Sequence, residues 1–384
     1  MEITHDRYLL APILEVLEKK LIFLGGPRQV GKTTLSQYIL ANLQSERMDS
    51  ESPAYLNWDI LSSRKKILAG ELPPNHKTIV LDEIHKYAKW RNLVKGFYDG
   101  FKDKKSFIVT GSARLDYYRK GGDSLQGRSR MFRLHPYSVN ELGLKSSSDL
   151  KVLLKFGGFP EPLFRQSEKD LRHWQNDRVN RVVYDDLRDL EKVREISLIE
   201  ELAEALPSRV GSILSIQSLR EDLQVSHEAT DRWIGILERL YFCYRIPPYG
   251  SPRIRAVKKE QKLYLWDWST LPSEGARFEN LVASQLLKYC HFLEDSEGHK
   301  MELRFLRDTD KREVDFVVLK DRKPIFAVEC KTGEKQLSPS ILYFKERTPI
   351  PKFYQVHLGN NDFEKSEGVR VLPFLKFCEV LNLP

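Results

Sequence analysis

Cysteine is scarce in this sequence, and long apolar runs are missing. The four cysteines, Cys243, Cys290, Cys330 and Cys378, lie far apart and form no CxxC pair, which argues against a zinc site or a disulfide framework. Apolar stretches such as 21–24 are much shorter than the ~20 residues of a membrane-spanning helix. The start, MEITHDRYLL, has no basic segment followed by an apolar core, so no signal peptide is expected. These absences predict a cytoplasmic protein without a membrane partner.

The length and composition are typical of a globular protein with several domains. The chain has 384 residues, of which 41% are hydrophobic and 30% charged, so it can bury sizeable cores. It contains 62 Lys and Arg against 54 Asp and Glu, a formal net charge of +8. This modest basic excess is compatible with a polyanionic partner and disfavours a wholly acidic binding surface.

Three regions follow one another along the chain. The first has short apolar runs separated by helix-compatible stretches, a pattern typical of a parallel sheet covered by helices. These runs are residues 21–24, 54–58, 78–81, 107–110 and 131–134. A charged, leucine-rich helical region follows, and strands return after the Pro- and Gly-rich segment 247–252. The expected fold class is multidomain α/β, with domains at 1–160, 161–250 and 251–384.

A glycine-rich loop follows the first apolar run. Its sequence, GPRQVGKT, matches GxxxxGK[ST] without a gap, between an expected strand and an expected helix. In this pattern backbone N–H groups surround phosphate oxygens, the lysine reaches the β and γ phosphates, and the hydroxyl binds Mg²⁺. The residues expected to bind the nucleotide are Gly26, Pro27, Arg28, Gln29, Val30, Gly31, Lys32, Thr33 and Thr34.

An acidic pair ends the apolar run 78–81. Because parallel strands bind ligands at their carboxyl ends, Asp82 and Glu83 are expected beside the glycine-rich loop. Asp82 would hold Mg²⁺ through water, together with Thr33, and Glu83 would activate the attacking water as a general base. An acidic pair can also simply complement a helix dipole, but its combination with the loop favours a nucleotide site.

Two more residues are candidates for this site. Ser112, in the segment GSAR, could orient water near the γ-phosphate, with an ordinary strand-end turn as the alternative. Arg128, in GGDSLQGRSR, could supply positive charge to the transition state, from the same chain or from a neighbour in an oligomer. Arg114 and Arg130 compete for that role, and a loop arginine can also be merely solvated.

These motifs together resemble those of the bacterial and archaeal AAA+-type P-loop ATPases. The segments that carry the resemblance are the glycine-rich loop, DEIHK, TGSAR, QGR, LHPYSVNEL and GGFPEP. More narrowly, the chain resembles the branch of these ATPases with a C-terminal domain of unknown function. The resemblance implies an AAA+-like ATPase domain, then a winged helix, then a restriction-endonuclease-like α/β domain of the PD-(D/E)xK type. It also implies ATP as the nucleotide, since nothing in the loop itself selects the base.

The middle region contains a helix-turn-helix pattern. Helices are expected at 215–223 and 227–240, followed by a strand at 241–246 and a basic loop that would form a wing. The loop's basic residues are Arg253, Arg255, Lys258 and Lys259. The residues that the second helix would present to DNA are Ser226, His227, Thr230 and Arg232. Such units also serve as packing modules, and the basic loop is the better candidate for phosphate contacts.

Acidic residues recur at strand spacing in the C-terminal region. Segments 313–319 and 325–331 are strand-like, and alternation places Glu329 and Lys331 on one face. If the two segments pair as a hairpin, Asp315 converges with them. Carboxylates bind Mg²⁺ or Mn²⁺, and the lysine can orient the attacking water, as metal-assisted phosphodiester cleavage requires.

Glu279 lies in an expected helix before these strands and completes the series E…D…ExK. This series resembles the PD-(D/E)xK nuclease signature, with Val314 in place of its proline. The predicted site residues are therefore Glu279, Asp315, Glu329 and Lys331, with Asp315 and Glu329 as metal ligands. A solvated Glu–Lys pair on an amphipathic sheet is the alternative.

The sequence thus favours an ATPase coupled to a metal-dependent, nucleic-acid-directed nuclease, with DNA as the first candidate partner. One alternative is a nucleotide-switched DNA-binding or regulatory protein whose nuclease fold does not cut. Another is an ATPase that remodels a protein partner.

Overall fold

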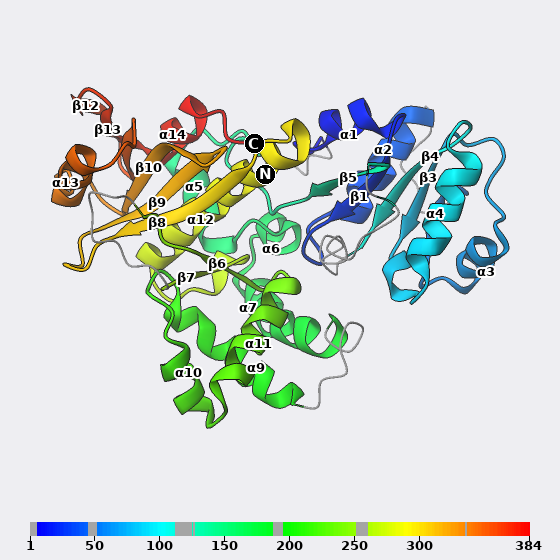
Figure 1. The fold of residues 1–384 in the computed structure, drawn as a ribbon, viewed down its shortest axis with the longest axis horizontal. Coiled ribbons are helices and arrows are strands. Elements are labelled where there is room, and N and C mark those ends of the chain that lie inside the picture. Colours follow the sequence, from blue (N-terminus) through cyan, green and yellow to red (C-terminus); the bar gives the residue numbers. More distant parts are fainter. Residues whose placement is uncertain are drawn as a thin grey trace. The chain divides into compact units, whose positions relative to one another are not determined.

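The chain divides into two compact units (Figure 1). The N-terminal unit is Glu2–Pro136 with Asp186–Lys192, and the C-terminal unit is Tyr137–Asp185 with Val193–Pro384 and Met1. The structure is a computed structural model that describes residues 6–44, 52–111, 125, 127–186, 195–250, 260–334 and 336–384. Within these residues, no helix is both long and apolar enough to cross a membrane.

The N-terminal unit is built on a five-stranded parallel sheet. Its strands, in the order β2-β3-β4-β1-β5, are β1 (Leu21–Gly25), β2 (Tyr55–Asn57), β3 (Thr78–Asp82), β4 (Ser106–Thr110) and β5 (Ser129–Arg133). Every residue of β3 and β4 is buried, because helices cover both faces of a parallel sheet. The five apolar runs are therefore confirmed as strands.

Helices follow most strands of this sheet. They are α1 (Leu10–Leu17), α2 (Lys32–Gln44), α3 (Leu61–Ala69), the 3₁₀ turn η1 (Ile84–Lys86) and α4 (Trp90–Phe101). Since all five strands run the same way, the ends of β1, β3 and β4 share one edge, the carboxyl edge of the sheet. The opposite, amino edge carries the strand starts.

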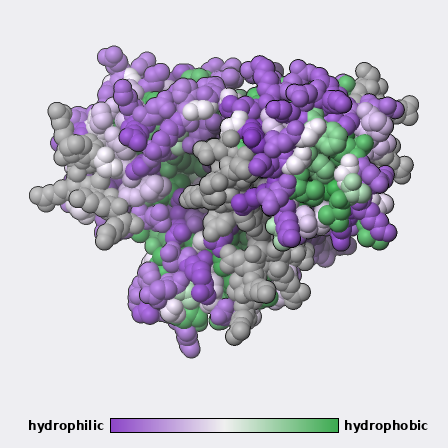
Figure 2. All heavy atoms as spheres, turned by 45° about the vertical axis from the view of Figure 1, so that its right-hand side comes forward, coloured by the Kyte–Doolittle hydropathy of each residue, from purple (hydrophilic) through white to green (hydrophobic). Residues whose placement is uncertain are grey.

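The face of the molecule drawn in Figure 2 is mainly hydrophilic, with hydrophobic residues gathered in a few places. In the N-terminal unit, Ile60, Leu61 and Leu68, at or next to α3, are each more than half exposed. The apolar side chains of β3 and β4 are buried, as a globular core requires.

Helices make up the first part of the C-terminal unit. They are α5 (Ser147–Phe156), α6 (Pro160–Arg165), α7 (Glu168–Asn180), η3 (Arg181–Asp186), α9 (Ile196–Ala205), η4 (Leu206–Arg209), α10 (Ile216–Leu223) and α11 (His227–Arg239). A two-stranded antiparallel hairpin follows, formed by β6 (Cys243–Ile246) and β7 (Lys262–Leu265). The two expected helices and the strand after them are confirmed.

The two helices α10 and α11 are capped as their sequence suggests. The Ser215 and Ser226 hydroxyls accept hydrogen bonds from backbone N–H groups of the first turns, and Gln224 ends α10 in the left-handed conformation. The expectation that Thr230 faces a DNA groove is wrong, because its side chain is fully buried and donates to the Ser226 carbonyl. The expected wing residues 253–259 lie outside the described residues.

A six-stranded mixed sheet forms the rest of the C-terminal unit. In the order β12-β13-β11-β10-β9-β8, its strands are β8 (Met301–Arg307), β9 (Glu313–Lys320), β10 (Lys323–Lys331), β11 (Phe353–His357), β12 (Phe363–Ser366) and β13 (Val369–Pro373). The long helix α12 (Glu274–Phe292) packs against β8, β9 and β10. The other helical segments are η5 (Trp268–Thr270), η6 (Leu293–Glu297), α13 (Pro339–Arg347) and α14 (Phe374–Val380). The predicted β9–β10 hairpin is present, with antiparallel pairing.

A β-bulge interrupts the pairing of β8 with β9. Arg304 lies opposite Val317, but Leu306 lies opposite Val314. Two residues of β9, Asp315 among them, therefore oppose a single residue of β8, and such a bulge changes the direction of the side chains next to it.

The division of the chain differs from the expected one. The C-terminal unit begins at Tyr137 rather than after residue 160, and it contains both the middle helices and the C-terminal sheet. A buried ion pair explains the early start: the Lys288 ammonium of α12 contacts the Glu141 carboxylate and donates to the Ser138 hydroxyl at 2.8 Å. The segment LHPYSVNEL therefore joins the C-terminal unit from Tyr137 onward.

Candidate functional site

The glycine-rich loop connects β1 to α2 at the carboxyl edge of the first sheet. Gly26 has φ +143°, and a Cβ there would lie 2.4 Å from the Leu134 carbonyl oxygen, so only glycine fits. Gly31 has φ +103°, a backbone conformation that glycine adopts without strain. Because α2 begins at Lys32, its unpaired N–H groups and the positive end of its dipole face the loop, as anion binding requires.

Lys32 lies over the loop. Its side chain is 6% exposed, and its ammonium donates to the carbonyl oxygens of Gly26 at 3.0 Å and Pro27 at 2.7 Å. An ammonium held by neutral carbonyls can exchange them for phosphate oxygens, which form stronger charge-assisted hydrogen bonds.

The other residues of the loop differ in their exposure. Pro27 and Val30 are buried, Arg28 and Thr34 are half-buried, and Gln29 is exposed at φ +59°. The loop therefore presents its backbone and Lys32, rather than many side chains, to a ligand.

The acidic end of β3 meets the first turn of α2. The Thr33 hydroxyl donates to Asp82 Oδ2 at 3.1 Å, so the predicted proximity of the acidic strand and the loop is confirmed. A hydroxyl beside a carboxylate suits a Mg²⁺ ion that shares its remaining ligands with phosphates and water. Among the described residues, no group of three or more acidic, His or Cys side chains could hold a metal ion by itself, so nucleotide phosphates would have to complete this site.

Residues from neighbouring strands hold Asp82 in place. The Tyr55 hydroxyl donates to Oδ2 and the Thr110 hydroxyl donates to Oδ1, while Asn57 Nδ2 lies 3.5 Å from Oδ2. Sequence reasoning missed all three. The signal that could have found them is their position in or at the end of apolar runs next to β3, at the same edge of the sheet.

Glu83 has a constrained backbone and a buried carboxylate. Its φ is +55°, an uncommon conformation for a residue with a side chain and one often found at functional sites. Its Oε2 makes no hydrogen bond within the described part of the chain; His85 Nε2 lies 3.7 Å from it and the Lys86 ammonium 3.8 Å. Burial raises the pKa of Glu83, although the Lys32 charge opposes the shift. Burial also lowers the pKa of His85 to about 4, so the ring is neutral near pH 7.

A buried arginine supports the loop from behind. Arg7 donates from Nη1 to the Val30 carbonyl at 2.9 Å and from Nη2 to the His135 carbonyl at 2.6 Å. A Cβ on Gly31 would lie 3.3 Å from Arg7 Nη1. Nothing in the sequence marks this arginine, because its contacts lie 23 and 128 residues away.

Of the two remaining candidates, only Arg128 is described, and it does not join the site within this chain. Ser112 lies outside the described residues. Arg128 precedes β5 at the amino edge, opposite the loop, where its guanidinium pairs with the Asp99 carboxylate at 2.8 Å. The same-chain role expected for Arg128 is therefore wrong, because the length of the sheet separates it from Asp82. A role toward a neighbouring chain stays a prediction.

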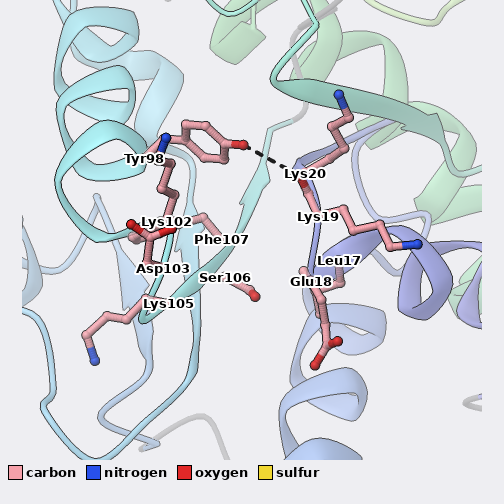
Figure 3. A pocket seen from close by; sticks show the side chains of 10 residues that line it. All are labelled: Leu17, Glu18, Lys19, Lys20, Tyr98, Lys102, Asp103, Lys105, Ser106 and Phe107. Carbon is pink, nitrogen blue, oxygen red and sulfur yellow. Dashed lines mark hydrogen bonds between the residues drawn. The ribbon is translucent and has the colours of Figure 1, made fainter.

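A basic hollow of about 220 Å³ lies at the same amino edge. Figure 3 shows the side chains that line it, which come from the end of α1, the end of α4 and the start of β4. The charged ones are Glu18, Lys19, Lys20, Lys102, Asp103 and Lys105. Lysines outnumber the acids, and Tyr98, at the rim, donates to the Lys19 carbonyl at 3.5 Å. The hollow is separate from the glycine-rich loop.

The predicted acidic residues of the C-terminal unit do converge. We call Glu279 of α12, Glu313 and Asp315 of β9, and Glu329 of β10 the acidic cluster. Asp315 Oδ2 accepts a hydrogen bond from the Cys330 N–H at 2.8 Å, and Lys331 Nζ lies 2.6 Å from Glu329 Oε1.

The pKa values of two carboxyls of the acidic cluster are strongly raised. Burial and the Asp315 charge together raise the pKa of Glu279 to about 7, although the Lys262 charge opposes the shift. Burial and the Asp315 charge likewise raise the pKa of Glu329 to about 7. Glu329 Oε2 is buried and has no hydrogen-bond partner in the described residues.

A lysine that sequence reasoning missed lies in the middle of this cluster. Lys262, the first residue of β7, is 1% exposed. Its ammonium lies 2.5 Å from Glu313 Oε1, 3.6 Å from Glu279 Oε1 and 3.8 Å from Asp315 Oδ1. Burial lowers the pKa of Lys262, but the three carboxylates raise it more, so it lies above its ordinary value. A charged residue at the start of the apolar run KLYLW was the available signal.

This arrangement does not fit the expected metal site at Asp315 and Glu329. No described group of acidic, His or Cys residues is arranged to hold a metal ion, and the Lys262 ammonium stands between three of the four carboxylates. A cation within 4 Å repels a second one strongly in a buried environment. The Lys262 ammonium beside Asp315 therefore counts against Mg²⁺ or Mn²⁺ at Asp315 and Glu329, which stays a prediction.

Three family models match consecutive parts of the chain. Residues 18–143 match a model described as an AAA domain. The chain carries an AAA-type, ATPase-like domain at its N-terminus. Residues 147–274 and 274–377 match models described as domains of unknown function, DUF8612 and DUF4143. The AAA-type domain coincides with the five-stranded parallel sheet and the glycine-rich loop.

Relatives match most of the chain. The uncharacterized protein Rv2008c of Mycobacterium tuberculosis is 24% identical over 367 residues, which cover 92% of this chain and 79% of that protein. The uncharacterized protein MJ1544 of Methanocaldococcus jannaschii is 22% identical over 413 residues, with 95% and 89% covered. Among solved structures, the Bacillus subtilis DNA clamp loader delta protein (YqeN) covers 60% of this chain and 88% of its own, with 12% identity and a TM-score of 0.29. This TM-score is too low to indicate a shared fold.

Proposed function

We propose that the protein binds ATP with Mg²⁺ and hydrolyses it at the glycine-rich loop. The contact between the Thr33 hydroxyl and the Asp82 carboxylate is the observation that carries this proposal. It joins the two halves of a nucleotide site that lie 49 residues apart in the sequence.

Each residue has a distinct task in this proposal. Lys32 and the N–H groups of the loop bind the β and γ phosphates, and Mg²⁺, when bound, neutralises charge that develops on them. Thr33 would contact the ion directly and Asp82 through water. Glu83 accepts a proton from the attacking water, for which its buried, hydrogen-bond-free oxygen is suited.

The test is nucleotide binding and phosphate release in two variants. Lys32→Ala should lose binding of a fluorescent ATP analogue, because the phosphates lose their nearest cation. Asp82→Asn should retain binding but lose Mg²⁺-dependent hydrolysis. Lys89→Ala removes an exposed lysine of the same unit and serves as the matched control. Wild-type hydrolysis by Lys32→Ala would refute the proposed site.

We also propose nucleic acid, with DNA as the first candidate, as the partner of this ATPase. The order of α10, α11 and the β6–β7 hairpin is that of a winged helix, and His227 and Arg232 are exposed on α11. The lysines of the basic hollow offer a second set of phosphate contacts.

The partner is tested by ATP hydrolysis with and without DNA or RNA at several salt concentrations. Stimulation that falls steeply with salt is expected, and Lys19→Glu with Lys102→Glu should weaken it if the hollow takes part. Hydrolysis that no nucleic acid changes would favour the remodelling of a protein partner instead. Light scattering with and without ATP tests self-assembly, which a role for Arg128 from a neighbouring chain requires.

For the C-terminal sheet we propose a nuclease-like fold that does not cut. The observation that favours this function over metal-dependent cleavage is the Lys262 ammonium inside the acidic cluster. The test is a panel of DNA and RNA substrates with Mg²⁺ or Mn²⁺, with and without ATP. Cleavage by the wild type that disappears in Asp315→Asn would restore the coupled-nuclease function.

A further inference from the structure

Lys262 reaches the acidic cluster from outside the six-stranded sheet. It begins β7, where it lies opposite Ile246 of β6 and bridges to Ile213 of the segment before α10. Its ammonium lies 5.8 Å from the centre of the Phe305 ring. The lysine therefore belongs to the β6–β7 hairpin, while the carboxylates it meets belong to α12 and β9.

The carboxylates around Lys262 each have a further partner. Tyr264 donates to Glu279 Oε1 at 2.8 Å, Arg307 donates to Glu313 Oε2 at 2.6 Å, and Asp315 accepts from the Cys330 N–H. Their oxygens are thus directed by fixed donors, and the ammonium completes the set. Buried carboxylates are stable in a protein only when paired and hydrogen-bonded in this way.

Counting charges shows how much the cluster depends on Lys262. Four carboxylates of the acidic cluster face three cations, Lys262, Arg307 and Lys331. With all groups ionised the sum is −1, and without Lys262 it is −2. A divalent ion could replace the ammonium, but it cannot sit beside it.

The chain also covers the cluster next to Lys262. Gly211, at φ +75°, lies so close that a Cβ would be 3.1 Å from both Glu279 carboxylate oxygens. Its N–H donates to the carbonyl of Leu263, the residue after Lys262, at 3.2 Å. This hydrogen bond holds Gly211 next to Lys262, and both residues lie against the Glu279 carboxylate.

We propose that Lys262 is the resident cation of the acidic cluster, and that it excludes divalent metal from the position between Glu279, Glu313 and Asp315. The β6–β7 hairpin is fastened to the C-terminal sheet by this charge. A metal ion enters only if the hairpin withdraws its lysine. This inference rests on the C-terminal unit alone and is independent of ATP hydrolysis at the glycine-rich loop.

The test measures Mn²⁺ binding to the full-length, nucleotide-free protein. Electron paramagnetic resonance reports the concentration of the free ion. Wild type and its Asp315→Asn variant should bind equally, since the cluster takes no metal. Lys262→Met should gain one site, at least about tenfold tighter than any wild-type site because an ammonium next to the ion has been removed. The gain should disappear in Lys262→Met with Asp315→Asn.

Thermal unfolding gives a second readout. Lys262→Met should unfold at lower temperature than wild type, and Mn²⁺ should restore part of the loss, whereas Lys262→Arg keeps the charge and should respond to no metal. Lys323→Met, at an exposed position of β10, is the control. A wild-type Mn²⁺ site that Asp315→Asn removes would overturn the proposal, and so would Lys262→Met without a new site. ATP hydrolysis of the same samples tests the glycine-rich loop separately.

Discussion

Replacing Glu83 with glutamine separates catalysis from stability at the nucleotide site. The substitution keeps the size of the side chain and removes its charge and its basicity. A general base contributes about 10²–10⁴-fold to a rate, which corresponds to about 2.7–5.4 kcal/mol of transition-state stabilisation. ATP hydrolysis by Glu83→Gln should fall by that factor, while the affinity for ATP stays close to that of the wild type.

The free energy of unfolding of this variant should not fall along with its activity. Glu83 is 19% exposed at its side chain, and its Oε2 lacks a hydrogen bond in the described residues, so the folded protein gains little from the ionised form. A folded-state pKa above the ordinary 4.5 means that ionisation destabilises the folded state as pH rises above that value. The neutral amide avoids this cost, so the free energy of unfolding at pH 7 should not decrease.

The assay is steady-state phosphate release together with nucleotide binding and urea unfolding. Glu71→Gln, at an exposed position of the same unit, is the matched control. Because the base acts only when ionised, the wild-type rate should fall as pH decreases through the raised pKa of Glu83, and so at higher pH than for an exposed glutamate. A wild-type rate of ATP hydrolysis in Glu83→Gln, whatever the stability of the variant, would refute the assignment of Glu83 as general base.

Three further predictions concern packing and assembly. Lys288→Met should destabilise the fold by about 3–5 kcal/mol, because the buried Glu141 carboxylate loses its ion-pair partner; urea unfolding of the double variant with Glu141→Gln should show partial recovery. Arg128→Ala should hydrolyse ATP normally at dilutions where the chain is monomeric, and slower turnover there would contradict its position at the amino edge. Gly26→Ala should weaken ATP binding measurably in a titration, because its Cβ would meet the Leu134 carbonyl at 2.4 Å; unchanged affinity would show that the loop can shift freely.

Local patterns in the sequence determined the elements and the loop. Alternation of apolar runs with helical stretches predicted the five strands of the first sheet, because parallel strands buried on both faces are continuously apolar. The glycines of the loop are fixed by backbone conformations that few other residues adopt. The two-residue period of β9 and β10 was enough to place Asp315 and Glu329 on one hairpin. Each of these properties depends on residues only a few positions apart.

Tertiary structure alone decided what surrounds those elements. Strand order placed Tyr55 and Thr110 around Asp82, and it put Arg128 at the edge opposite the loop. Packing of the β6–β7 hairpin against α12 and β8 brought Lys262 among the carboxylates, 51 residues before Glu313. No period or spacing encodes such contacts, because they depend on the order and register in which distant segments pack. The sequence therefore identified the acidic residues, and only the fold revealed the cation that stands between them.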